Sequence, residues 1–233
     1  MMPAPIGLAF YHGWGLNSTF WQPLASRLCD HPQTFFDAGY WGGPPCQPDF
    51  RAATHWVAIG HSMGWARALT QAPPSGWSGL VSLGGFTRFC AHQPGDAGQS
   101  RRVVDRMAKV LARTPHAVLQ DFLSRCGLSA LCPDEATPLQ TDRLLADLLH
   151  LAELDLSPQW QQTATPTLAL ACLDDPIVPA ALTTATFAQH PGAQLVWHSQ
   201  GGHALGHDQA CDCAQAIQAF LSTLDDGQRT HQP

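Results

Sequence analysis

Short apolar runs along the chain alternate with segments whose apolar residues recur at helical spacing. The runs that predict strands are residues 6–11 (IGLAFY), 34–37, 55–60 (HWVAIG), 79–85, 167–173 and 194–198. Short, continuously apolar strands separated by helices are typical of a mostly parallel sheet with helices on both faces. The pattern therefore predicts the α/β class.

Helical periodicity marks the segments between these runs. Residues 18–28 predict an amphipathic helix capped by Ser18, with Pro23 in its first two turns. Residues 63–71 predict the helix that follows strand 55–60, and residues 210–224 predict a closing helix.

A long stretch in the second third of the chain has a different pattern. Residues 86–165 are helical in pattern throughout and are too long for a single crossover between neighbouring strands. We expect a helical cap made of residues 86–165, inserted into a core made of residues 1–85 and 166–233.

The composition narrows the class of protein. No apolar run approaches the roughly 20 residues that cross a membrane, and the first residues lack the basic flank of a secretory signal. We therefore expect a cytoplasmic protein that does not contact a membrane. Its eight cysteines contain no CxxC pair, which favours free thiols.

Charge is unevenly distributed along the chain. The net charge of −6 makes nucleic acid a poor candidate partner, yet seven of the 12 Lys and Arg residues lie between positions 88 and 125. That stretch also holds three acids, so it carries 7 − 3 = +4 and the rest of the chain −6 − 4 = −10. A basic segment on an acidic body indicates a surface for an anionic partner.

The sequence GHSMG, residues 60–64, lies between a predicted strand and a predicted helix. In that context G-x-S-x-G forms a sharp turn that exposes the serine above the sheet as a nucleophile. The glycines leave room for the crowded backbone, and the amide of Met63 faces the space where an oxyanion would form. Ser62 is the candidate nucleophile.

A serine needs a base, and the base needs an orienting acid. Asp174 and Asp175 follow strand 167–173, and His203 lies in the loop after the last strand. This order of serine, acid and histidine is the one expected after such a turn. We choose Asp175 over Asp174 because DPIVP resembles an acid loop that leads into a proline-started helix. The backbone amide of Trp14, in the HGWG loop after the first strand, is the second candidate oxyanion donor.

HGWG, GHSMG, DPIVP and GGH, in this order, resemble the motifs of the α/β-hydrolase fold. The stretch HGWGLNSTFW is similar to the front motif of the pimeloyl-acyl-carrier-protein methyl ester esterases of biotin synthesis. The resemblance implies a serine carboxylesterase that needs no cofactor or metal and cleaves the methyl ester of a pimeloyl chain on acyl-carrier protein.

The resemblance also implies a carrier-docking role for basic residues of the cap. The candidates share one predicted helix: Arg101, Arg102, Arg106, Lys109 and Arg113. Four of them, at 102, 106, 109 and 113, are spaced for one helical face, although a solvated basic face is the common alternative. Candidate lining residues of an acyl pocket are aromatic: Trp14, Trp65, Phe86 and Phe89.

Other functions remain open at this point. The same triad would serve a broad short-chain carboxylesterase, a thioesterase or a lactonase, and a hydrolase-like chain can also be a non-catalytic binding protein. A metal site can be assembled from His203, His207, Cys211 and Cys213, but His203 is better used by the triad. Otherwise His207 is expected to be a surface residue.

Overall fold

The computed structural model describes the backbone of residues 5–230 and the side chains of residues 5–224. Its centre is a six-stranded sheet in the order β2-β1-β3-β4-β5-β6, with every neighbouring pair parallel. The strands are β1 (Ile6–Tyr11), β2 (Gln33–Phe36), β3 (His55–His61), β4 (Gly79–Leu83), β5 (Thr167–Cys172) and β6 (Ala193–His198). The predicted parallel α/β architecture is confirmed.

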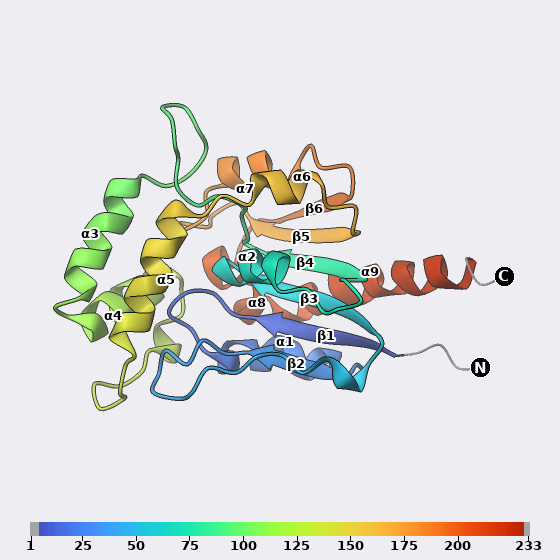
Figure 1. The fold of residues 1–233 in the computed structure, drawn as a ribbon, viewed down its shortest axis with the longest axis horizontal. Coiled ribbons are helices and arrows are strands. Elements are labelled where there is room, and N and C mark those ends of the chain that lie inside the picture. Colours follow the sequence, from blue (N-terminus) through green and yellow to red (C-terminus); the bar gives the residue numbers. More distant parts are fainter. Residues whose placement is uncertain (1–4, 231–233) are drawn as a thin grey trace.

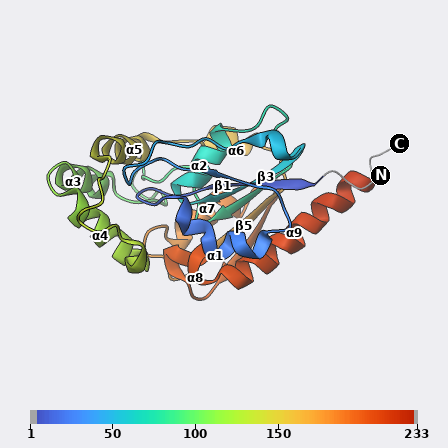
Figure 2. The ribbon, with the colours of Figure 1, turned by 90° about the horizontal axis from the view of Figure 1, so that it is seen from below.

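Helices cover both faces of the sheet because the central strands are apolar on both sides. In β1, β4 and β5 every residue is buried. One face carries α1 (Gln22–Ala25), α8 (Leu205–Asp208) and α9 (Ala210–Thr230) (Figure 2). The other face carries α2 (Met63–Thr70), α6 (Ser157–Gln161) and α7 (Ala180–Phe187), whose aromatic side chains contact one another.

Three further helices form a layer beyond the carboxyl ends of the strands, opposite the chain termini (Figure 1). They are α3 (Arg101–Leu111), α4 (Pro115–Arg125) and α5 (Thr141–Glu153). We refer to these three helices as the cap helices. Short 3₁₀ turns lie at Phe50–Ala52, Ser129–Leu131 and Gly202–Ala204.

Two predicted helical stretches differ from the structure. Residues 18–28 form a 3₁₀ turn (Ser18–Trp21), α1 and a second 3₁₀ turn (Ser26–Leu28), because Pro23 removes a backbone donor within the first turns. The cap at their start is Asn17, whose side chain accepts from the Thr19 amide, and not Ser18. In the stretch predicted to be helical throughout, residues 86–100 are an irregular loop closed by a Cys90–Gln99 bridge, and residues 126–140 are irregular apart from the 3₁₀ turn Ser129–Leu131.

Within residues 5–230, no helix is both long enough and apolar enough to cross a membrane.

Candidate active site

The strand register brings the loops that carry the HGWG motif, Ser62, Asp175 and His203 to one edge of the sheet. We call these four segments the site loops. Tyr11 pairs with Gly60, His61 with Leu83, and Cys172 with His198. These strands therefore end close to one level, and the loops that follow them meet beneath the cap helices. This edge is where open parallel sheets bind their ligands.

Ser62 occupies the turn between β3 and α2. Its φ of 54° makes it the only non-glycine residue with positive φ in the described chain, a strained conformation for an L-residue. Two close approaches hold the turn. A Cβ at Gly60 would lie 2.5 Å from the Cα of Trp65, and one at Gly64 would lie 1.9 Å from the Tyr11 carbonyl oxygen. Only glycine fits either place, which explains the G-x-S-x-G spacing.

Asp175 and His203 form a buried pair next to this turn. The Nδ1–H of His203 donates to Oδ2 of Asp175 at 2.8 Å, and Oδ1 accepts the amides of Ile177 and Val178. Burial opposes the charged carboxylate, but His203 and the two amides together lower the pKa of Asp175 below its ordinary value. The Nε2 of His203 is buried and has no partner among the described residues, so it remains available to Ser62.

The neighbouring acid has a different contact. Asp174 is exposed, and its Oδ1 accepts the amide of Gly202 and the thiol of Cys172. The structure thus joins Asp175, and not Asp174, to the His203 ring.

The HGWG loop lies directly against the nucleophile. A Cβ at Gly13 would lie 3.1 Å from the Cβ of Ser62. His12, which is fully buried, accepts the Ala38 amide at Nε2 and donates from Nδ1 to the Gly13 carbonyl at 2.8 Å. His12 therefore fixes the loop that carries the Trp14 amide, a role that the sequence interpretation did not assign. The indole of Trp14 donates to the carbonyl of Leu144 in α5 at 2.8 Å.

A mainly apolar cavity connects Ser62 with the cap helices. Its wall comes from the site loops, α3, α4 and α5 and comprises Trp14, Ser62, Phe89, Gln99, Val103, Val104, Met107, Phe122, Arg125, Leu148, Leu151 and Ile177. The side-chain amide of Gln99 donates to the Ile177 carbonyl. Arg125 is the cationic residue of this wall. The sequence analysis did not identify the cap residues that line the cavity. For α3, the recurring apolar positions of residues 101–111 already indicated a side of the helix that faces inward.

Of the four aromatic residues expected in the pocket, Trp14 and Phe89 line it. Trp65 and Phe86 are fully buried elsewhere. Trp65 faces away from the cavity because α2 turns it toward Trp160 and Phe187, at ring-centroid distances of 5.5 and 5.6 Å. The ring of Phe86 packs against that of Phe89, with 5.0 Å between the ring centroids.

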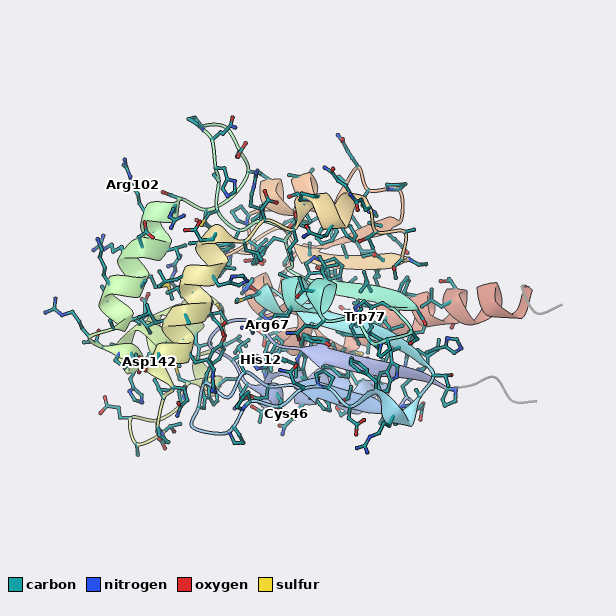
Figure 3. The ribbon with its side chains drawn as sticks, viewed as in Figure 1. His12, Cys46, Arg67, Trp77, Arg102 and Asp142 are labelled. Atoms are coloured by element: carbon teal, nitrogen blue, oxygen red, sulfur yellow. The ribbon has the colours of Figure 1, made fainter. Side chains whose placement is uncertain are left out.

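The basic residues of α3 and its C-terminal flank divide into two groups. Arg101 forms ion pairs with Glu153 of α5 and with Asp105, so it joins two cap helices. Arg102, Arg106, Lys109 and Arg113 are exposed and have no acidic partner within residues 5–224. We call these four residues the basic cap face; Figure 3 marks Arg102 on its outer side.

The residues of the alternative metal site do not gather. Cys213 is buried and Cys211 exposed, while His207 forms a surface pair with Asp208. Among the described residues there is no group of three or more His, Cys, Asp or Glu side chains that suits a metal ion.

Comparison with known proteins places this site in a family. The chain is 30% identical over 243 residues to a pimeloyl-[acyl-carrier protein] methyl ester esterase of Xanthomonas campestris pv. campestris (strain B100), covering 93% of this chain and 95% of that protein. The chain belongs to the α/β-hydrolase family of esterases. This esterase is also 29% identical to the protein of the same name from Xanthomonas axonopodis pv. citri (strain 306), with the same coverage. No protein-family model matches the chain.

Solved structures agree on the fold of this esterase. An esterase from Exiguobacterium antarcticum superposes with a TM-score of 0.77 at 16% identity, covering 93% of this chain and 91% of that one. MenH from S. aureus superposes with a TM-score of 0.74 at 16% identity, covering 95% of this chain and 94% of that one. The expected α/β-hydrolase fold and carboxylesterase class are confirmed.

Proposed function

We propose that this esterase cleaves carboxylic esters through an acyl-enzyme formed on Ser62. The observation that carries the proposal is the buried Asp175–His203 pair, with a free Nε2, beside a serine held at positive φ. Such an arrangement supplies the base, its orienting acid and an exposed nucleophile.

In the first step, Ser62 Oγ attacks the ester carbonyl while His203 Nε2 takes the hydroxyl proton. The Met63 and Trp14 amides donate to the oxyanion; in the described chain neither amide donates to another protein group. His203 then protonates the departing alcohol. Water, deprotonated by His203, releases the acid from Ser62 in the second step.

We further propose that the physiological substrate is the methyl ester of a pimeloyl chain on acyl-carrier protein. The names of the related proteins support this substrate. The apolar wall of the cavity suits an acyl group, and the basic cap face suits an acidic carrier. Methanol and a free carboxylate would be the products.

The catalytic role is tested with a short p-nitrophenyl ester. Ser62→Ala should lower kcat at least about 10³-fold, because the acyl-enzyme cannot form. Ser75→Ala, at an exposed serine that does not line the cavity, is the control and should leave kcat unchanged. Activity retained in Ser62→Ala would exclude the acyl-enzyme, and chelator sensitivity would favour a metal site.

The substrate is tested in a biotin auxotroph that lacks its own esterase. The wild-type chain should restore growth and Ser62→Ala should not. If the wild-type chain is folded and cleaves short esters but does not restore growth, the pimeloyl substrate is wrong and a broad esterase, thioesterase or lactonase replaces it. A folded chain that binds acyl esters without cleaving any would be a binding protein.

A further inference from the structure

His61 directly precedes Ser62, and the proposed reaction leaves it without a role. It ends β3 and is 2% exposed, enclosed between the site loops and the core. Its ring lies 4.5 Å from that of Phe20 and 4.7 Å from that of His203, measured between centroids.

The contacts of His61 fix its tautomer. Its Nε2 lies 2.8 Å from the backbone carbonyl oxygen of His203. Because a carbonyl only accepts, Nε2 carries the proton. The other nitrogen, Nδ1, is buried without a partner among the described residues and faces Gly13, where a Cβ would lie 2.8 Å away. The Nδ1 lone pair of His61 therefore faces the backbone of Gly13 and not a hydrogen-bond donor of the described chain.

The ring is also uncharged. Burial, followed by the nearby His203, lowers the pKa of His61 to about 3. A neutral neighbour is required here, because His203 becomes an imidazolium when it takes the serine proton and a second cation would oppose that step.

The segment before His203 needs an anchor. Gly201 and Gly202 have φ values of 116° and 51°, which glycine adopts freely. Because neither residue has a side chain, no side-chain packing holds the backbone at these two positions. Asp175 holds the His203 ring at one nitrogen, and Asp174 accepts the Gly202 amide, but neither contact reaches the backbone carbonyl of His203. The His61 hydrogen bond reaches that backbone from the rigid end of β3.

We propose that His61 is a positioning residue that holds the backbone of His203, so that Nε2 of His203 faces Ser62. This role rests on the proposed function. It explains why an imidazole stands beside the nucleophile without taking part in proton transfer. A displacement of about 1 Å in a catalytic group costs about 10²-fold in rate.

Two amide variants test the role. In His61→Gln the side-chain amide reaches the place of Nε2 and keeps a donor for the His203 carbonyl. In His61→Asn the amide reaches only the place of Nδ1. We expect His61→Asn to lower kcat on a short p-nitrophenyl ester about 10²-fold with KM within about twofold of wild type. The kcat of His61→Gln should be at least about tenfold higher than that of His61→Asn.

A second readout follows the nucleophile alone. Stoichiometric labelling of Ser62 by a fluorophosphonate should slow in His61→Asn by the same factor as kcat, because both need His203 in place. The matched control is His207→Gln. His207 packs 6.0 Å from the same Phe20 ring but contacts Asp208 rather than His203, and this variant should keep wild-type values.

Equal kcat in the Gln and Asn variants, whether high or low, overturns the positioning role. Should both variants fail to fold, ¹⁵N-histidine NMR of the wild-type chain decides. Protonated Nε2 and bare Nδ1 on His61 between pH 5 and 9 support the role, and the opposite tautomer or a charged ring overturns it. Failure of the proposed function shows separately, as activity retained by Ser62→Ala.

Discussion

Asp174 and Asp175 are neighbours in the chain but differ in environment. Asp175 is 8% exposed and accepts from the His203 ring, whereas Asp174 is exposed and accepts the Gly202 amide. Because the pKa of Asp175 lies below its ordinary value, the folded state binds fewer protons at this group than the unfolded chain. Its stabilisation is therefore present above about pH 4 and is lost as the pH falls through the folded pKa.

Replacing each acid by its amide should separate their roles. Asp175→Asn should lower kcat about 10³- to 10⁴-fold, because an amide facing Nδ1 favours the wrong tautomer of His203. Asp174→Asn should cost less than about tenfold, since its amide oxygen still accepts from Gly202. The measurement is kcat on a short p-nitrophenyl ester, with melting temperatures as a control for folding. Comparable losses would contradict the assignment of Asp175.

At the scale of elements, α5 is the cap helix tied most closely to the core. Oδ2 of Asp147 accepts from Arg67 of α2 at 2.6 Å and from the Tyr40 hydroxyl at 2.5 Å. Arg143 donates to the carbonyls of Ala38 and Gly39. Figure 3 marks Arg67 at the boundary between the sheet and the cap helices.

Removing the carboxylate of Asp147 should destabilise the fold. The side chain of Arg67 is 12% exposed, so Asp147→Asn leaves a nearly buried cation without its counter-charge. We expect a loss of about 2 kcal/mol in the free energy of unfolding, between the values for surface and buried pairs. Urea denaturation measures it. Asp105→Asn, in a more exposed pair with Arg101, is the control and should cost less than about 1 kcal/mol.

The elements show how far the sequence alone can predict this molecule. All six strands and the loops bearing Ser62, Asp175 and His203 follow from local apolar runs and turn residues. The cavity wall does not, because it depends on which face of a distant helix turns inward. Trp65 illustrates this limit: it follows the nucleophile turn closely, yet α2 directs it into the core, while Phe122 from the cap reaches the cavity.

At the scale of the whole molecule, charge is separated in space. The basic cap face lies on the outer side of the molecule, and the remaining chain is acidic. An acidic carrier would therefore be attracted to the basic cap face, which orients its approach.

Charge reversal on the basic cap face should affect carrier-bound substrates selectively. Arg102→Glu with Arg106→Glu should raise KM for a carrier-bound methyl ester about tenfold or more at low salt, and added salt should reduce the difference from wild type. Hydrolysis of a short p-nitrophenyl ester should not change. Arg27→Glu with Arg51→Glu makes the same change in net charge at exposed sites outside the cap and is the matched control. Equal effects of the two pairs would contradict docking on the cap.

The indole of Trp14 connects the loop beside Ser62 with cap helix α5. Its backbone amide belongs to the proposed oxyanion hole, while its ring nitrogen donates a hydrogen bond to α5, whose Leu148 and Leu151 line the cavity at Ser62. If an acyl chain packs against α5 as proposed, this bond would couple that packing to the position of the Trp14 amide, and the coupling would be reciprocal. Binding energy from methylene groups remote from the ester can in this way be expressed as turnover rather than as affinity.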